Sequence, residues 1–247
     1  MIFHDVEPQS IEWFTLRLGI PTSSEFDKVM TPKKLERSSQ ADDYMYRLLE
    51  EWWTGEQSEG QQYQAPWMER GQDLEDQAIS AYEDIYLKGR TDRGGFCTTD
   101  DGMIGCSPDR RIETDGLLEV KCPLLKGQIR TLLEPRGSSE GHWTQLQGQM
   151  LVTGRKWVEV FSYHPRMILD PIRVTRDDQF IEALEKQLRA FVLDMLLRRE
   201  RIIELGHPQP ERPKPVPPPP VPDGLSDDDA DLIIEANRRR DQEGRDV

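Results

Sequence analysis

The spacing of hydrophobic residues changes along this chain, from the three- and four-residue spacing of helices to the two-residue alternation of strands and back. Segments with helical spacing lie at 10–19, 23–30, 41–55, 66–87, 139–154 and 177–206. Segments with strand-like alternation lie near 93–99, 102–106, 116–121, 156–164 and 170–175. The order of these elements predicts an α/β (α+β) fold in which helices flank a central mixed β-sheet.

Residues that begin or end helices stand at the limits of several segments. Ser10 has the side chain of an N-cap, and Gly19 suits the left-handed position that follows a helix. Asp177 or Asp178 caps the longest helix, and Gly206 follows its end. These residues set the helix limits to within a residue or two.

A proline-rich run divides the chain. The segment GHPQPERPKPVPPPPVPDG, at 206–224, can form neither the interior of a helix nor a central strand. We therefore expect a folded domain over 1–206, an extended linker over 207–224 and an acidic tail over 225–247. Ser226 and the acids after it predict a short helix in the tail, either a frayed end or a peptide that folds on a partner.

Composition excludes several classes of protein. No apolar run reaches the roughly 18 residues that span a bilayer, and the N-terminus lacks the basic and apolar regions of a signal peptide. Cys97, Cys106 and Cys122 are odd in number and form no C-x-x-C pair, so we expect reduced thiols in a cytoplasmic protein. Three cysteines also exclude a zinc or iron–sulfur site with four cysteine ligands.

The net charge of −14 argues against a nucleic-acid partner, because DNA binding uses positive surface. A site for a divalent metal nevertheless needs carboxylates, and a small basic lining is compatible with an acidic exterior. The charge is therefore an objection that any DNA-binding function has to answer.

Three charged residues stand close together in the middle of the chain. Glu119 and Lys121 are two apart in an expected strand and share a face, whereas Leu118 and Val120 face the core. Asp109 follows the strand expected at 102–106, so a hairpin between the two strands would bring it to the same face. Carboxylate oxygens, the Val120 carbonyl and water are ligands that Mg²⁺ and Mn²⁺ prefer.

Such a set suits the hydrolysis of a phosphate ester. A bound metal would activate water and stabilise the charge at phosphorus, while Lys121 would orient or deprotonate that water or neutralise the phosphorane. The alternative is an ion pair between Glu119 and Lys121 on an exposed strand face, the usual meaning of an E-x-K triplet. The preceding Pro-Asp pair, Val120 between the charges and the following Cys-Pro pair favour the site.

The motif SPD…LLEVKCP resembles the P-D…(D/E)-x-K motif of the restriction-endonuclease-like nucleases. More closely, it resembles the lambda-type exonucleases of phage recombination systems, also called YqaJ-like viral alkaline nucleases. Four further segments fit that family in the same order: WFTLRLGIPTSSEF, ERGQDLEDQAISAYE, HWTQLQGQMLVTG and VFSYHPRM. One such motif is weak, but five in order are specific. The resemblance implies a restriction-endonuclease-like core.

The resemblance also implies roles for individual residues around the motif. Asp109 and Glu119 match metal ligands, and Lys121 matches the catalytic lysine. Gln145 matches a glutamine that completes the active site. Glu75 matches an acidic residue on a helix that can serve a second metal position.

Alternatives remain open for two of these residues. Glu75 could be a surface glutamate of a very acidic helix. Gln145 could be a buried, satisfied amide, and Gln147 and Gln149 are nearby competitors for its role.

Two residues near the N-terminus match positions that bind a 5′-terminal phosphate. Arg17 offers a guanidinium that grips phosphate bidentately, and Ser24 offers a hydroxyl beside free backbone N–H groups. The alternatives are a solvated helix charge at Arg17 and a simple N-cap at Ser24. The family's T-A-S reads T-S-S here, so Ser23 competes with Ser24.

The resemblance implies a metal-dependent 5′-to-3′ exonuclease that acts on linear double-stranded DNA and leaves 3′ single-stranded overhangs for recombination by strand annealing. It implies Mg²⁺ or Mn²⁺ as cofactor, a ring-shaped homotrimer, and a single-strand annealing recombinase as partner of a phage protein in the bacterial cytoplasm. Two alternatives stay open: another DNA nuclease of the same superfamily, for repair or end processing, and a non-catalytic adaptor that binds DNA ends. The intact set of Asp109, Glu119 and Lys121 argues against the adaptor.

Overall fold

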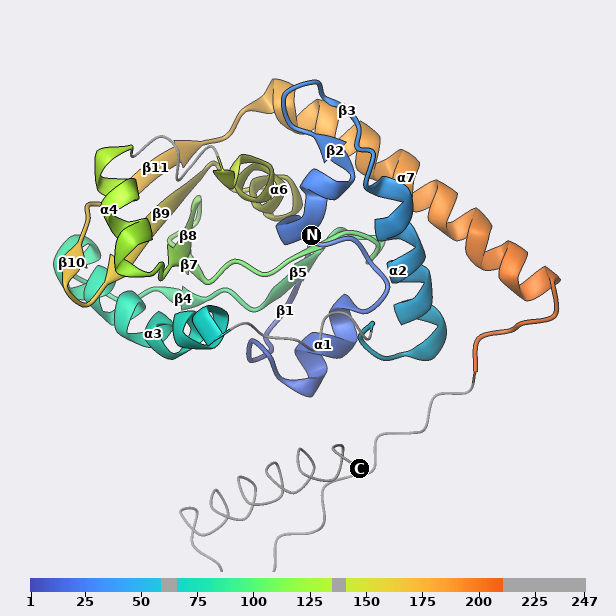
Figure 1. Cartoon of the computed structure of the whole chain (residues 1–247), viewed down its shortest axis with the longest axis horizontal. Helices are drawn as coiled ribbons and strands as arrows, with labels where there is room; N and C mark the ends of the chain where they lie inside the picture. The colour runs from blue at the N-terminus through green and yellow to red at the C-terminus, as the bar shows by residue number, and fades with distance from the viewer. Residues whose placement is uncertain (59–65, 135–140, 211–247) are drawn as a thin grey trace, which may run out of the picture. The chain divides into compact units, whose positions relative to one another are not determined.

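The computed structural model describes residues 1–58, 66–134 and 141–210, and Figure 1 shows how their elements are arranged. The helix expected in the acidic tail and the linker beyond Pro210 lie outside the described residues. The division of the chain into domain, linker and tail therefore stays a prediction.

A six-stranded mixed sheet forms the centre of the fold. Its main path runs through β10 (Met167–Ile168), β9 (Trp157–His164), β8 (Gly116–Lys121), β7 (Arg110–Ile112) and β4 (Asp92–Arg93), and β11 (Ile172–Thr175) also pairs with β9. Strands β8 and β9 are parallel, whereas the other neighbours are antiparallel. The predicted mixed sheet is confirmed.

Helices pack against both faces of this sheet. They are α3 (Pro66–Tyr82), α4 (Leu125–Leu133), α6 (Trp143–Thr153) and α7 (Asp178–Glu204). Tyr82 of α3 packs with Leu118 on one face, and Met150 of α6 packs with Leu117 on the other. Neighbouring residues of β8 thus point into two different cores, as alternation along a strand requires. This places Glu119 on the face that α6 covers.

A third core lies where α2 (Ala41–Thr54) packs along α7, and the two helices run side by side in Figure 1. Tyr44 and Phe191 stack there with ring centroids 5.7 Å apart. The small elements around this core are β1 (Ile2–His4), β5 (Phe96–Thr98) and β6 (Gly105–Cys106), which form one sheet, and the pair β2 (Met30–Thr31) and β3 (Glu36–Arg37).

Helix α1 (Ile11–Arg17) has the ends that the sequence predicts. The Ser10 hydroxyl accepts a hydrogen bond from Trp13 N at 3.2 Å, and Gly19 takes a φ of +70° after the helix. Asp177 likewise caps α7, since its carboxylate accepts from Phe180 N at 3.0 Å. The capping residues at these helix ends are therefore the ones that the sequence predicted.

The helix predicted over 23–30 is instead a short 3₁₀ helix, η1 (Ser23–Lys28). Its N-cap residue is Thr22, which makes no side-chain capping bond, so the predicted capping role of Ser24 is wrong.

The strand predicted over 93–99 is also wrong in detail. It breaks at Gly94 and Gly95 into β4 and β5, which belong to different sheets. Gly95 has a φ of +62°, a conformation that L side chains rarely adopt, and this turn redirects the chain. The strand predicted over 102–106 shrinks to β6 and pairs with β5, so the expected hairpin with 116–121 does not form. Its place beside β8 is taken by β7, which the sequence did not suggest.

Two helical segments also differ from expectation. Helix α4 was missed although Leu125, Ile129, Leu132 and Leu133 have helical spacing, because it is short and contains Gly127. Ile129, Leu132 and Leu133 are exposed, and the side chain that the helix buries is the polar Gln128. The helix predicted over 66–87 ends at Tyr82 and continues as one π-helical turn, η3 (Glu83–Leu87).

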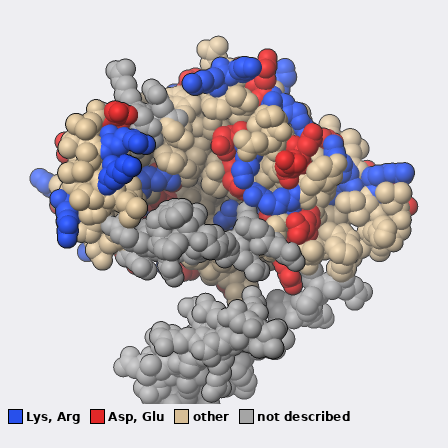
Figure 2. Space-filling view, viewed as in Figure 1, with Lys and Arg blue, Asp and Glu red and all other residues tan. Residues whose placement is uncertain are grey.

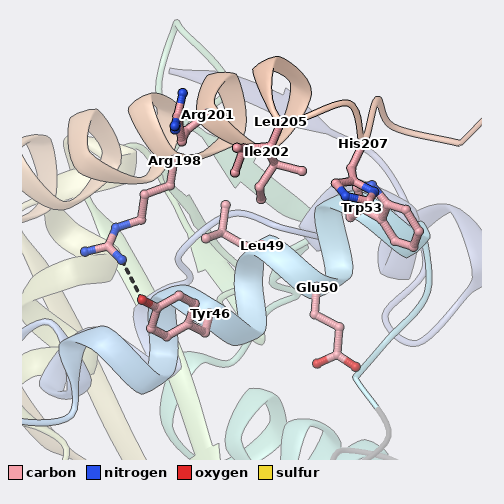
Figure 3. Close-up of a pocket in the computed structure, with 9 residues that line it drawn as sticks. All are labelled: Tyr46, Leu49, Glu50, Trp53, Arg198, Arg201, Ile202, Leu205 and His207. Carbon is pink, nitrogen blue, oxygen red and sulfur yellow. Dashed lines mark hydrogen bonds between the residues drawn. The ribbon is translucent and has the colours of Figure 1, made fainter.

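In the described ranges, no helix is both long enough and apolar enough to cross a membrane. On the face shown in Figure 2, lysine and arginine side chains are interspersed with acidic ones rather than gathered into one basic patch. A hollow of about 610 Å³ between α2 and the end of α7 is shown in Figure 3, where Arg198 donates to the Tyr46 hydroxyl at 2.8 Å. It is mostly apolar and contains none of the predicted site residues.

Candidate functional site

Asp109 stands immediately before β7, where the chain passes close to Gly94. A Cβ on Gly94 would lie 1.6 Å from the Pro108 carbonyl oxygen, so only glycine permits this approach. Gly94 N also donates to the Asp109 carbonyl at 3.3 Å. The Asp109 carboxylate accepts a hydrogen bond from Val120 N at 2.6 Å, which holds it against β8.

Glu119 lies inside the protein and is only 3% exposed. Its Oε1 accepts from Lys121 Nζ at 2.6 Å and from Gln145 Nε2 at 2.7 Å. Its Oε2 accepts from Gln149 Nε2 at 2.7 Å. Because a buried carboxylate is stable only with such donors, these contacts exclude the alternative of an exposed surface ion pair.

Lys121 ends β8 and is half-buried beside this carboxylate. Its Nζ lies 3.5 Å from Gln145 Oε1. Burial disfavours the charged ammonium, but the charges of Glu119 and Asp109 outweigh it and raise the pKa of Lys121. The lysine is therefore a proton-bearing donor in the ligand-free protein.

Glu75 adds a third carboxylate from α3. Burial, followed by the charges of Glu119 and Asp76, raises the pKa of Glu75. Burial, followed by the charges of Glu119 and Glu75, raises the pKa of Asp109 well above its ordinary value. The charges of Arg110 and Lys121 act in the opposite direction on Glu75, but burial and the neighbouring carboxylates outweigh them.

The chemistry of this donor set suits a hard divalent cation. Asp109, Glu119 and Glu75 supply carboxylate oxygens, and a cation would relieve the repulsion that raises the pKa of Asp109 and Glu75. Across residues 1–58, 66–134 and 141–210, no three His, Cys, Asp or Glu side chains are already gathered to hold an ion. Lys121 and Gln145 would have to release Glu119 Oε1 before that oxygen could bind one.

A cleft of about 520 Å³ joins these carboxylates to the predicted phosphate ligands. Five predicted site residues line it: Asp109, Glu75, Gln145, Arg17 and Ser24. Glu119 and Lys121 do not line it and are linked to it by their contacts with Gln145. The structure thus brings residues from both halves of the predicted site to one cavity.

Arg17 is held in the cleft by stacking and by one weak hydrogen bond. Its guanidinium carbon lies 4.4 Å from the centre of the Trp13 ring. Its Nη2 donates to Thr22 Oγ1 at 3.5 Å, and that hydroxyl lies 3.4 Å from Ser24 Oγ. Arg17 is half-buried and stacked, so it is not the solvated helix charge of the alternative, and burial lowers its pKa.

Ser23 and Ser24 differ in accessibility although both line the cleft. Ser23 is buried, whereas Ser24 is exposed. This favours Ser24 as the hydroxyl that a ligand in the cleft would reach.

Sequence reasoning missed the part played by Gln149, which it treated only as a competitor of Gln145. The two residues are four apart on α6 and therefore share a helix face, from which each donates to a different oxygen of Glu119. Gln147 lies on another face, donating to the Thr175 carbonyl and accepting from Asp177 N. The i, i+4 spacing of two glutamines was the available signal.

A comparison with known families gives a match over residues 12–156, to the YqaJ-like viral recombinase domain. The chain belongs to this family. The matched range contains every predicted site residue from Arg17 to Gln145. A search of curated proteins gives no significant match.

Three solved structures of exonucleases are similar to this YqaJ-family chain. The alkaline exonuclease LHK-Exo from Laribacter hongkongensis is 28% identical, with a TM-score of 0.70 over 80% of this chain and 98% of the other. LHK-Exo in complex with dAMP is 30% identical over the same shares, also with a TM-score of 0.70. A phage-related exonuclease from Haemophilus somnus 129PT, at 12% identity, has a TM-score of 0.54 over 83% of this chain and 97% of its own.

These likenesses fix the fold class of the YqaJ-family chain. Its mixed sheet with helices on both faces is restriction-endonuclease-like, as the motif in β7 and β8 led us to expect. The Haemophilus protein, at its low identity, supports the fold alone.

Proposed function

We propose that this chain is a metal-dependent DNA exonuclease that degrades the 5′-ended strand of linear double-stranded DNA and leaves 3′ single-stranded overhangs. The observation that carries the proposal is the single cleft in which Asp109, Glu75 and Gln145 meet Arg17 and Ser24. A strand end whose terminal phosphate binds Arg17 would be held beside the carboxylates. Such a site selects an end rather than an internal position.

The carboxylates would hold Mg²⁺ or Mn²⁺. Asp109 and Glu119 are the proposed ligands together with the Val120 carbonyl, and Glu75 would serve a second position. When bound, the metal would supply an activated water and stabilise the charge that develops at phosphorus.

Lys121 and Gln145 would act on the substrate and on the water. Lys121 Nζ lies 2.6 Å from Glu119 Oε1 and 3.5 Å from Gln145 Oε1, so we assign it contact with the scissile phosphate or the attacking water beside that carboxylate. Gln145 lines the cleft and contacts both Glu119 and Lys121, so its amide would orient the attacking water between them.

The relatives support this function. LHK-Exo is described as an alkaline exonuclease and has been crystallised with dAMP, a nucleoside monophosphate. The family description, a viral recombinase domain, supports a role in phage recombination.

We extend the proposal to a homotrimer and to a single-strand annealing recombinase as partner. In such a ring, the basic residues of each cleft would meet DNA while the acidic exterior does not, which answers the objection from net charge.

The first test is digestion of linear duplex DNA labelled at either the 5′ or the 3′ end, with Mg²⁺, Mn²⁺ or EDTA. We expect early release of the 5′ label with metal and none with EDTA, while a covalently closed circle of the same sequence stays intact. Release of the 3′ label first would identify a different nuclease of the superfamily. Binding of ends without digestion would identify an adaptor.

Substitution of Gln149 by methionine tests whether the buried amide positions Glu119. We expect a loss of about 10- to 100-fold in kcat, the usual range for a residue that orients a metal ligand. Gln147→Met is the matched control from the same helix, because it also replaces a buried amide, one that makes two hydrogen bonds where the Gln149 amide makes one. It should lower the melting temperature while kcat falls less than twofold. Equal loss of kcat in both variants would show that Gln149 is only structural.

A further inference from the structure

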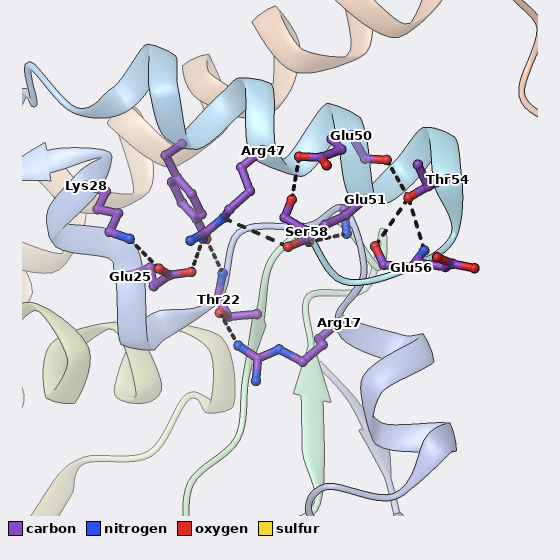
Figure 4. A network of polar contacts seen from close by, with 12 residues as sticks. Arg17, Thr22, Glu25, Lys28, Arg47, Glu50, Glu51, Thr54, Glu56 and Ser58 are labelled. Atoms are coloured by element: carbon purple, nitrogen blue, oxygen red, sulfur yellow. Dashed lines mark hydrogen bonds and ion pairs between the residues drawn. The ribbon is translucent and has the colours of Figure 1, made fainter. Parts of the chain in front are cut away.

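One wall of the cleft carries charged residues that the carboxylate–lysine set does not use. Arg17, Arg47 and Glu25 line this wall, while Lys28 pairs with Glu25 and Glu51 lies beside Arg47. We call these three cations and two carboxylates, from α1, η1 and α2, the arginine corner. Figure 4 shows Arg47 reaching down from α2 between Glu25 and Glu51, with Arg17 below Thr22. The cations outnumber the carboxylates, so the corner favours an additional anion.

Arg47 is largely buried and incompletely bonded. Its guanidinium carbon lies 4.8 Å from the centre of the Tyr44 ring, which fixes its plane. Its Nη2 donates to Glu25 Oε2. Its Nε is buried and makes no hydrogen bond within the described part of the chain, while Glu51 Oε1 lies 3.9 Å away. A buried guanidinium with an unused donor has capacity for another acceptor.

The carboxylate of Glu25 binds Arg47 at the wall of the cleft. Its two oxygens are shared, with Oε1 accepting from Lys28 Nζ at 2.5 Å and Oε2 accepting from Arg47. Burial disfavours the carboxylate, but the hydrogen bonds from Arg47 and Lys28 outweigh burial and lower the pKa of Glu25. Glu25 lines the cleft, and its carboxylate is thus an anion of the protein itself that already binds Arg47 there.

Arg17, like Arg47, makes a single hydrogen bond among the described residues. Of its donors, one bonds Thr22 at 3.5 Å, and no other hydrogen bond from its guanidinium is found among the described residues. Glu51, the nearby carboxylate, is already held by Gly19 N at 3.1 Å. Arg17 and Arg47 therefore present two under-used guanidiniums to the same cavity.

Resting on the proposed function, we propose that Arg47 is a second ligand of the 5′-terminal phosphate, and that Glu25 is an internal competitor which the phosphate must displace. A terminal phosphate monoester carries nearly two negative charges and three acceptor oxygens, whereas an internal phosphodiester carries one charge. The monoester can therefore displace a single carboxylate from a guanidinium, whereas the diester cannot. Glu25 thus makes the corner specific for phosphorylated ends and against internal phosphates.

The test measures binding of blunt duplexes with 5′-phosphate or 5′-hydroxyl ends by fluorescence anisotropy in EDTA, where cleavage is absent. We expect Arg47→Gln to weaken binding of the phosphorylated duplex about 10-fold or more, the value of one charged hydrogen bond, and to leave the hydroxylated duplex unchanged. Glu25→Gln should tighten binding of the phosphorylated duplex several-fold, because it removes the competitor. Inorganic phosphate should raise the melting temperature of wild type more than that of Arg47→Gln.

Two further variants keep the test decisive if Arg47→Gln folds poorly. Arg47→Lys retains the charge but not the planar fork, and should lose part of the preference for phosphorylated ends. Arg189→Gln removes an exposed arginine that pairs with Glu185 at 2.6 Å outside the cleft, and should change neither duplex. Equal changes for both duplexes, or weaker binding of the phosphorylated duplex by Glu25→Gln, would overturn the proposal.

The same duplexes incubated with Mg²⁺ separate this inference from the proposed function. If wild type prefers phosphorylated ends in EDTA but digests nothing with metal, the nuclease proposal fails and the arginine corner stands. If wild type digests DNA and Arg47→Gln keeps the wild-type ratio between the two ends, the corner fails and the nuclease stands.

Discussion

Lys121→Met is expected to reduce digestion of linear DNA about 10³-fold, the loss expected when a positioned proton-bearing group is removed from phosphoryl-transfer chemistry. Lys121 Nζ lies 2.6 Å from Glu119 Oε1. Methionine keeps the length of the side chain but can neither donate a hydrogen bond nor neutralise the phosphate. Single-turnover digestion of end-labelled duplex measures the effect without interference from product release.

The same substitution lowers stability, because it leaves Glu119 with one cation fewer in a buried place. Two variants separate this effect from catalysis. Lys121→Arg keeps the charge and should keep the fold, yet its planar guanidinium should still leave activity at least about 100-fold low. Lys156→Met makes the same change at an exposed lysine paired with Asp115 at 2.7 Å, and should cleave normally. Wild-type activity in Lys121→Met would remove the lysine from the mechanism.

The chemical half of the site could be predicted from sequence because its residues are close along the chain. Glu119 and Lys121 share a face of one strand by simple alternation, and Gln145 stands near the start of α6, a helix that the sequence predicted. The means by which Asp109 reaches them could not be predicted, since it depends on Gly94 passing against Pro108 and on β7 replacing the expected partner strand. Those are tertiary contacts without a local signature.

The residues proposed to bind phosphate could be predicted only in part. Arg17 and Ser24 were found by resemblance, although the expected helical cap at Ser24 is a 3₁₀ turn without a capping bond. Arg47 comes from a different helix, whose sequence gives only an ordinary amphipathic pattern, so its place in the cleft emerges only when α2 packs beside η1. Long-range packing therefore decides which charges of a very acidic chain line its cavity.

Asp109→Asn is the second substitution with a large expected effect, and it should act in opposite directions on activity and on stability. Removal of a proposed metal ligand should reduce cleavage about 10³-fold, the rate equivalent of several kcal/mol of charge stabilisation. Asparagine can still accept the hydrogen bond from Val120 N, but it no longer repels Glu119 and Glu75. The metal-free variant should therefore melt higher than wild type, by about 2–4 °C for each kcal/mol of repulsion relieved.

The pH dependence gives the sign of this stability effect. The pKa of Asp109 is raised in the folded state by burial and by the charges of Glu119 and Glu75, so its proton stabilises the fold at low pH and that contribution is lost as pH rises through the folded pKa. The gain in melting temperature should consequently be larger at pH 8 than at pH 5. Asp84→Asn removes the same charge from an exposed position and should show no such trend.

Added Mg²⁺ should make wild type melt higher than Asp109→Asn, because a ligand that binds only the folded wild type stabilises it by mass action. Calorimetric scans at both pH values, with EDTA or Mg²⁺, decide the matter: a variant that melts below wild type in EDTA at pH 8 would mean that Asp109 is a satisfied structural acid rather than one of several carboxylates held together for a cation.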